Sequence, residues 1–185
     1  MDEALEGAQL VFRERGYDGA SLSQLSTAMR LTAGSIYKAF SDKRAIFLAA
    51  FNRYTEKRND ELQRLIDAET TGRAKLQAML TFYADSAHGI EGRRGCLVAG
   101  SAVELATFDT DIADRVKAAV QRTETLLRKL IRLGQADGSL PATIDVDASA
   151  LALLCFLQGL RVVGKVGRTR SEVTAAVNRA LQLIA

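Results

Sequence analysis

The stretch from Ser21 to Lys43 holds the residues whose types and spacing suggest a chemistry. Hydroxyl and cationic side chains recur in it, at Ser21, Thr32, Ser35, Tyr37, Lys38 and Lys43. Serine at the expected start of a helix lies beside free backbone N–H groups, which bind phosphate oxygens well. The chain has a single histidine and no nucleophile-elbow or phosphate-loop motif, so we expect binding to a polyanion rather than reaction at a bond.

Positive charge gathers in the same part of the chain. From residue 30 to residue 58, seven basic residues stand against two acidic ones, a local balance of +5, whereas the whole chain carries +3. The basic residues are Arg30, Lys38, Lys43, Arg44, Arg53, Lys57 and Arg58, and the acidic ones are Asp42 and Glu56. Such a stripe is typical of a nucleic-acid-binding surface, although an ordinary solvated face explains Tyr37 and Lys38 equally well when they are taken alone.

Two short helices joined by a tight turn must position these side chains. Ser21 is the expected N-cap of the first helix, which carries Leu22, Leu25 and Met29. The second follows a break at residues 30–32 and turns Ile36 and Phe40 inward. Ser26, at the inner corner, lets the two helices approach, and an earlier helix covers both with Leu5, Ala8 and Phe12. The second helix then exposes Thr32, Ala33, Ser35, Lys38 and Ala39, a face that suits entry into a DNA major groove.

Helical periodicity continues to the end of the chain, and the single proline permits long helices. We therefore expect an all-α fold of about nine helices, with a helix-turn-helix head and a larger body. The expected domains are a DNA-binding head over residues 1–45, a connecting helix over 46–66 and a ligand-binding and dimerisation domain over 67–185. Ser41 is the expected cap of the connecting helix, and the glycine-rich stretch Gly89–Gly95 is expected to be a loop.

The run from Ser21 to Lys43, followed by Ile46 and Phe47, resembles the DNA-binding signature of the tetracycline-repressor (TetR/AcrR) family. Matching positions are Thr32, Gly34, Ile36, Tyr37, Phe40 and Lys43, with Phe12 and Gly16-Tyr17 upstream. The resemblance implies that Ser21, Tyr37 and Lys43 bind backbone phosphates. It also implies that Thr32, Ala33, Ser35 and Lys38 face the groove, with Lys38 reading a base.

Two positions depart from the family pattern. Arg30 stands where the family often has a turn glycine, so it is expected to need an unusual backbone angle. Ala39 replaces a bulkier residue and removes one DNA contact. Neither departure changes the expected fold.

The resemblance further implies a homodimeric repressor on a pseudo-palindromic, double-stranded operator, released by a small-molecule effector. The last two helices are the expected dimer interface, because residues 151–163 are apolar on more than one face. A monomer that buries both sides internally is the alternative. The candidate effector pocket is apolar, which suggests a hydrophobic or aromatic ligand, and no buried charge identifies it. Its candidate lining residues are Leu80, Tyr83, Phe108, Leu127 and Phe156, although each is also an ordinary core candidate.

Cys96 is a candidate redox residue. The run Arg93-Arg94-Gly95-Cys96-Leu97 resembles a motif of one subgroup of the family and places the thiol at a helix start beside two arginines. A small residue packed at a helix start is the simpler interpretation.

Several classes of function are not expected. The sequence predicts no catalytic residues, no metal site and no cofactor, and the distant cysteines Cys96 and Cys155 are expected to be free thiols. No apolar run approaches the length of a membrane span and no signal peptide is evident, so we expect a cytoplasmic protein with no membrane contact. A helical ligand-binding or thiol redox-sensing module without DNA binding is the competing interpretation.

Overall fold

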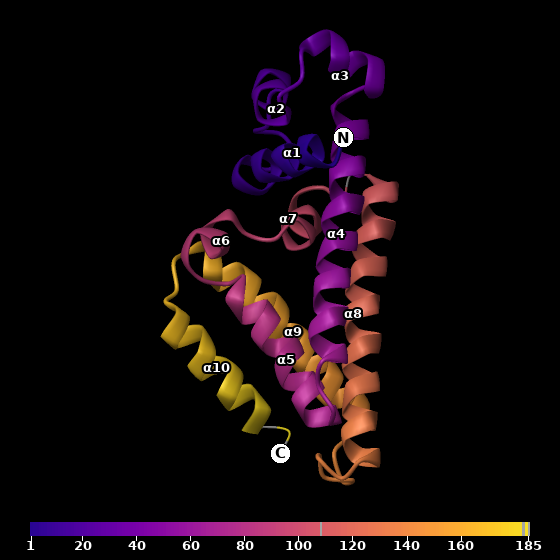
Figure 1. Ribbon diagram of the computed structural model, residues 1–185, viewed down its shortest axis with the longest axis vertical. Helices are drawn as coiled ribbons and strands as arrows, with labels where there is room; N and C mark the ends of the chain where they lie inside the picture. The colour runs from indigo at the N-terminus through magenta and orange to yellow at the C-terminus, as the bar shows by residue number, and fades with distance from the viewer. Residues whose placement is uncertain (108, 183, 185) are drawn as a thin grey trace. The chain divides into compact units, whose positions relative to one another are not determined.

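Helices make up the regular structure of the computed structural model, which describes residues 1–107, 109–182 and 184 (Figure 1). Ten helices lie within those ranges: α1 (Asp2–Arg15), α2 (Leu22–Met29), α3 (Ala33–Ala39), α4 (Lys43–Asp67), α5 (Gly72–Asp85), α6 (Gly89–Arg94), α7 (Leu97–Glu104), α8 (Thr110–Ala136), α9 (Val146–Lys165) and α10 (Arg170–Gln182). The predicted all-α fold class is confirmed.

The helices pack into two compact units. Unit 1 comprises Met1–Asn59 and Cys96–Lys117, and unit 2 comprises Asp60–Gly95 and Ala118–Ala185. The long helices α4 and α8 each contribute to both. Residues 96–117 therefore pack with the N-terminal helices, whereas the sequence analysis assigns them to the region 67–185. Contacts between residues far apart in the chain cause this difference, and local patterning cannot show them.

Unit 1 is built on close helix packing and an aromatic core. A Cβ on Gly7 of α1 would lie 2.0 Å from the carbonyl oxygen of Ala28 in α2, so only glycine allows these backbones to approach this closely. Phe12 of α1 packs edge-on against Phe47 of α4, with ring centres 5.1 Å apart. The carboxylate of Glu104 in α7 accepts the backbone N–H of Asp18 at 3.0 Å, which ties α7 to the turn after α1.

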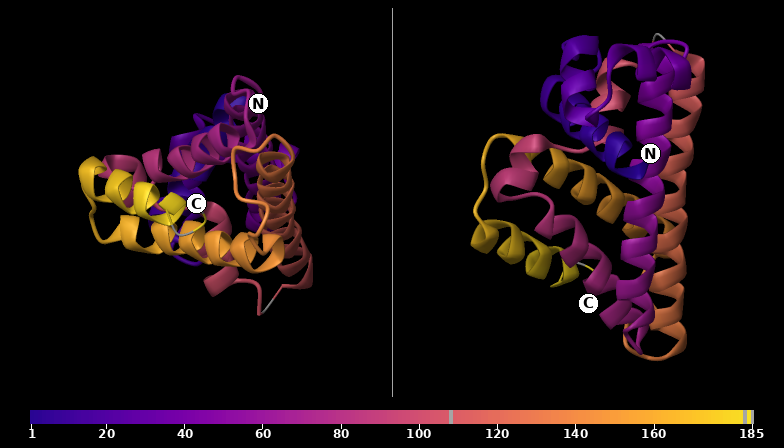
Figure 2. Two further views of the ribbon diagram at one scale, coloured as in Figure 1. Left: turned by 90° about the horizontal axis from the view of Figure 1, so that it is seen from below. Right: turned by 45° about the horizontal axis from the view of Figure 1, so that its top comes forward.

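Unit 2 surrounds a core shared by α5, α9, α10 and the second halves of α4 and α8 (Figure 2). Its fully buried side chains include Leu76, Met79, Leu80, Leu127, Leu130, Ile131, Leu157 and Val173. The start of α5 touches the end of α8, where a Cβ on Gly72 would lie 2.0 Å from the backbone nitrogen of Gly134. Asp137 fixes this contact by accepting the Gly72 N–H at 2.6 Å.

Two local predictions need correction. The stretch Gly89–Gly95, expected to be a loop, contains α6, because Gly92 is buried and lets α6 pack closely against Ala87 and Gly164. The cap of α4 is Asp42 rather than Ser41, since the Asp42 carboxylate accepts the Ala45 N–H at 2.7 Å. Glycine can serve packing as well as flexibility, and sequence spacing alone does not distinguish adjacent cap candidates.

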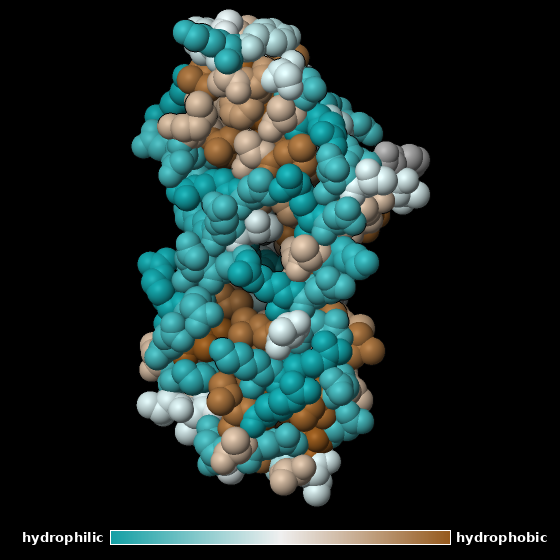
Figure 3. Space-filling view, turned by 90° about the vertical axis from the view of Figure 1, so that its right-hand side faces the viewer, coloured by the Kyte–Doolittle hydropathy of each residue, from teal (hydrophilic) through white to brown (hydrophobic). Residues whose placement is uncertain are grey.

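The outer faces of α8 and α9 differ in character. Charged residues occupy exposed positions of α8, at Lys117, Arg122, Lys129 and Arg132. The surface drawn in Figure 3 is largely hydrophilic, with hydrophobic patches between the hydrophilic side chains. Apolar residues remain exposed along α9. This helix is long and apolar enough to cross a membrane on length and composition alone, contrary to the expectation that no run approaches that size.

Candidate nucleic-acid interface

The helix-turn-helix begins at a well-formed cap. Ser21 Oγ accepts the Gln24 N–H at 3.2 Å, and the Gln24 side chain accepts the Ser21 N–H at 3.0 Å. This reciprocal capping box fixes the start of α2. Ser21 is exposed, so other N–H groups of the first turn remain available to a phosphate.

Ser26 and Arg30 shape the turn between α2 and α3. The Ser26 hydroxyl donates to the carbonyl of Leu31, and the Ser26 carbonyl accepts the Leu31 N–H at 3.1 Å. Arg30 has φ 54° and ψ 38°, the one left-handed non-glycine residue in the described ranges. The unusual angle predicted for Arg30 is confirmed. Ser26 therefore closes the turn with its hydroxyl as well as fitting the inner corner.

The outer face of α3 carries most of the residues predicted to contact DNA. Thr32 caps the helix by accepting the Ser35 N–H at 3.2 Å, and their hydroxyls lie 2.9 Å apart. Ile36 is 3% exposed and anchors the inner face, whereas Tyr37 is 61% exposed. The remaining predicted residues, Ala33, Ser35 and Lys38, are exposed as well. A groove of about 320 Å³ runs between α2 and α3, lined by Leu22, Ser23, Ser26, Thr27, Ala33, Ile36 and Tyr37.

Lys43 is placed differently from the others. It is half-buried, and Nζ donates to the carbonyl oxygens of Tyr17 at 2.9 Å and Ala20 at 3.2 Å. The same ammonium lies 4.4 Å from the centre of the Tyr17 ring. An ammonium has three N–H donors, so one remains for a phosphate. Lys43 therefore holds the turn between α1 and α2 in addition to the phosphate contact predicted for it.

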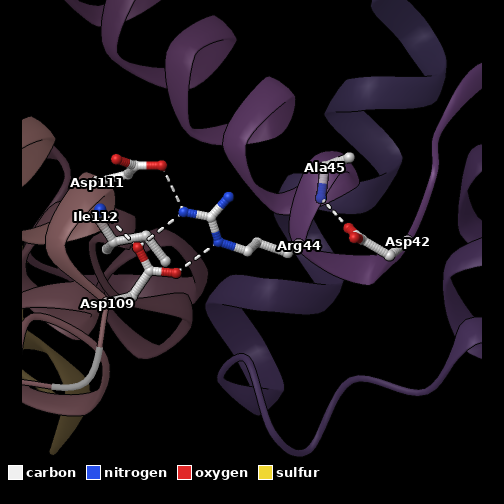
Figure 4. A network of polar contacts seen from close by, with 6 residues as sticks. All are labelled: Asp42, Arg44, Ala45, Asp109, Asp111 and Ile112. Atoms are coloured by element: carbon white, nitrogen blue, oxygen red, sulfur yellow. Dashed lines mark hydrogen bonds and ion pairs between the residues drawn. The ribbon is translucent and has the colours of Figure 1, made fainter.

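The positive stripe is weaker in the folded chain than in the sequence count. Arg44 pairs with Asp109 and Asp111, Arg53 pairs with Asp2, and Lys57 pairs with Glu6, all at 2.6–2.8 Å within unit 1. Figure 4 shows the Arg44 guanidinium between its two carboxylates. The count of +5 overlooked these acidic partners because they lie outside residues 30–58. Exposed positive charge on the helix-turn-helix itself comes from Arg30 and Lys38.

Comparison with known families identifies this arrangement. Residues 4–50 match the family described as bacterial regulatory proteins, tetR family. Residues 72–182, more than half of the chain, match the tetracyclin repressor-like C-terminal domain. The chain belongs to the TetR family. It is a DNA-binding transcriptional regulator and not an enzyme.

Relatives of this TetR-family protein match it over nearly its full length. It is 25% identical over 187 residues to the HTH-type transcriptional repressor ComR of Escherichia coli (strain K12), covering 98% of this chain and 87% of ComR. It also resembles a cysteine mutant of the TetR family transcriptional regulator CifR, complexed with 26 bp double-strand operator DNA. That match has a TM-score of 0.86 and 32% identity, and covers 98% of this chain and 95% of CifR.

The described residues predicted to line the effector pocket belong to the hydrophobic core of unit 2 or pack against it. Leu80 of α5 and Leu127 of α8 are fully buried in the core, and Tyr83 of α5 and Phe156 of α9 are partly buried against it. Phe108 lies outside the described residues. The hydroxyls of Tyr83 and Thr123 are 3.3 Å apart, which gives the region a polar group.

A buried charge, which the sequence analysis did not expect, lies beside Tyr83. Arg161 of α9 is 4% exposed, and its guanidinium carbon is 4.7 Å from the centre of the Tyr83 ring. The signal that could have revealed it is that Arg161 is the one charged residue in the run 151–163.

Cys96 is the N-cap residue of α7 and is half-buried. Of the two neighbouring arginines, Arg94 pairs with Glu91 at 2.7 Å, while Arg93 is exposed. The geometry places the thiol at a helix start, as predicted. Its redox role stays a prediction.

Proposed function

We propose that this TetR-family protein is a cytoplasmic repressor that binds a pseudo-palindromic operator as a homodimer and leaves it when a small effector binds in unit 2. The exposed N-terminal face of α3 carries this proposal. Hydrogen bonds of Thr32 and Ser26 cap α3 and close the turn before it, and the short polar side chains of this face suit the major groove. The CifR complex with operator DNA and the repressor ComR, both similar over nearly the full chain, support the same role.

A homodimer accounts for the exposed apolar face of α9. Leu151, Val162 and Val166 are 52%, 64% and 78% exposed, and with Cys155 and Gly159 they follow one side of the helix. A Cβ on Gly159 would meet nothing within 4 Å, so this glycine leaves room for a helix from outside the unit. Two such faces would bury each other, with the exposed side of α10 beside them.

The effector is proposed to bind among Leu80, Tyr83, Leu127 and Phe156. These side chains come from α5, α8 and α9, so a ligand between them would alter the packing of α8, a helix that continues into unit 1. Such a ligand can shift DNA affinity only by binding the released state more tightly than the DNA-bound state.

DNA binding is tested by selecting duplexes from a random pool and measuring the affinity for the winning duplex as salt is varied. The wild type should bind more weakly as salt rises, because phosphate contacts release counterions. Lys38→Ala should lose about 1–3 kcal/mol of binding free energy and tolerate base changes at one operator position. Lys117→Ala removes the same charge from exposed α8 and serves as the matched control.

Tyr37→Ala should weaken binding to all duplexes alike, since its proposed partner is a phosphate. Lys43→Ala is less informative, because it also removes two hydrogen bonds within unit 1. Absence of any salt-dependent duplex binding would refute the proposal and favour a ligand-binding module without DNA binding.

A further inference from the structure

Arg161 is the charged side chain that the proposed function leaves unexplained. It lies on α9 directly after the buried Leu160 and one turn after the buried Leu157, and it is 4% exposed. Arginine normally buries its aliphatic stem and extends its guanidinium into water. Here the guanidinium stays inside, against the ring of Tyr83 on α5.

The protein does little to satisfy this group. A guanidinium has five N–H donors, and the described residues accept one of them, where Nη1 donates to the Ser86 carbonyl at 3.5 Å, the outer limit of a hydrogen bond. Nε is buried and has no hydrogen-bond partner. No carboxylate in the described ranges pairs with Arg161; Asp85, one residue before Ser86, lies 4.0 Å from His88 and from Arg170 instead.

An unpaired charge in a core is strongly unfavourable, because transfer from water costs far more than one weak hydrogen bond and a ring contact return. Leucine or methionine would fill the same space without that cost. A bound anion that pairs with the Arg161 guanidinium would remove this cost and would account for a buried arginine at this position. A single positive charge in apolar surroundings selects a monoanion, since a dianion would leave one negative charge unbalanced.

We propose that Arg161 binds the carboxylate of a small monocarboxylic acid with an apolar body, and that this acid is the effector class. A guanidinium fork presents Nε and an Nη to both carboxylate oxygens at once. The hydroxyls of Tyr83 and Thr123 offer further polar contacts on neighbouring helices, and apolar side chains of the unit 2 core, such as Leu157 one turn before Arg161, would hold the body of the acid. This inference depends on the proposed function only where it calls the acid an effector, because binding of the acid at Arg161 is tested without DNA.

The first experiment uses the full-length wild type at constant ionic strength. Its unfolding temperature is measured with acetate, hexanoate and benzoate, and with acetamide, hexanamide and benzamide, which match them in shape and lack the charge. At least one carboxylate should raise the unfolding temperature while its amide does not. If no carboxylate raises it, or if the amides act equally, the proposal is overturned.

The second experiment places the site. The stabilising carboxylate should bind Arg161→Met at least about tenfold more weakly, the loss expected for a hydrogen bond to a charged group. Arg168→Met removes an exposed arginine and should bind like the wild type. Without ligand, Arg161→Met should unfold at or above the wild-type temperature, because it removes an unpaired buried charge. If Arg161→Met binds the carboxylate as tightly as the wild type does, Arg161 is not the binding residue and the proposal is overturned. If this variant fails to fold, the comparison of carboxylates with amides on the wild type still tests the proposal.

A third, separate experiment measures binding to operator DNA. Operator affinity without ligand tests the regulator, and its change with the stabilising carboxylate tests the effector role. Carboxylate binding that depends on Arg161 but leaves operator affinity unchanged would support the site and refute its role as the effector site. Failure of operator binding without ligand would refute the proposed function and leave the carboxylate site supported.

Discussion

Arg44 and Asp109 form a two-point ion pair, in which Nε donates to Oδ2 at 2.6 Å and Nη2 donates to Oδ1 at 3.0 Å (Figure 4). Nη2 also donates to Asp111 Oδ2 at 2.6 Å, so Arg44, the second residue of α4, is joined to the beginning of α8. Arg115 adds a second link when it donates to the Asn52 side chain at 2.6 Å. Within unit 1 these contacts hold the first half of α4 to the beginning of α8 and to Asp109 just before it.

The Arg44–Asp109 pair predicts a pH dependence of stability. Hydrogen bonding by Arg44 lowers the pKa of Asp109 from 3.8 to about 2. A lowered pKa stabilises the folded state above pH 3.8, and that contribution is lost as pH falls toward 2. Asp109→Asn keeps a capping oxygen and removes the charge, so it should be less stable than the wild type at pH 7, with a difference that shrinks between pH 4 and pH 2. Urea unfolding across this range measures it, with exposed Asp114→Asn as the control.

Gly7→Ala should destabilise unit 1 by about 3 kcal/mol, because its Cβ would collide with the backbone of Ala28 rather than with a movable side chain. Gly34→Ala is the control, since a Cβ there meets nothing within 4 Å. The control should gain up to about 1 kcal/mol from helix propensity. Chemical unfolding of both variants without DNA gives the two values, and equal stability of the variants would contradict the packing described for α1 and α2.

Arg30→Gly should be more stable than Arg30→Ala by about 1 kcal/mol, because both remove the charge and only glycine adopts the left-handed conformation without steric cost. Arg30→Val should be the least stable of the three. Urea midpoints in the absence of DNA rank them. A ranking with Ala above Gly would show that the turn does not hold residue 30 at a positive φ.

Val162→Asp should convert the proposed dimer to a monomer, because it places a charge within the apolar face of α9. Ile90→Asp makes the same change at an apolar residue of similar exposure, 62% against 64%, on α6. Sedimentation velocity at micromolar concentration should show the second variant as a dimer. Monomer formation by both variants, or by neither, would remove α9 from the interface.

Cys96→Ser should abolish any loss of operator affinity caused by hydrogen peroxide if this thiol senses oxidants. Cys155→Ser removes the other thiol, which lies on the face of α9 proposed to form the dimer, and should respond like the wild type. Affinity is measured before and after oxidation and again after reduction. An unchanged response in the Cys96 variant would leave the cysteine as a small residue packed at the start of α7.

Local pattern was enough to predict the helices of the head. The spacing of Leu25, Met29 and Ile36 defines buried faces with a helical period, and Ser21 and Thr32 precede helix starts where their hydroxyls accept free N–H groups. The resemblance to the family, which often has a turn glycine at the position of Arg30, predicted an unusual backbone angle there, and the angle is left-handed. These features depend on residues a few positions apart, so the sequence by itself determined the helix-turn-helix and the outward face of α3.

Tertiary structure decided how charge is distributed, because the partners come from distant parts of the chain. A count of charges over residues 30–58 treats three side chains as unpaired cations, Arg44, Arg53 and Lys57. Their carboxylate partners come from α1 and from the start of α8. Arg161 shows the opposite case, a cation whose surroundings supply no carboxylate within the described residues. Coulomb energy and desolvation depend on distance in space and on burial, and neither quantity is fixed until the helices have packed.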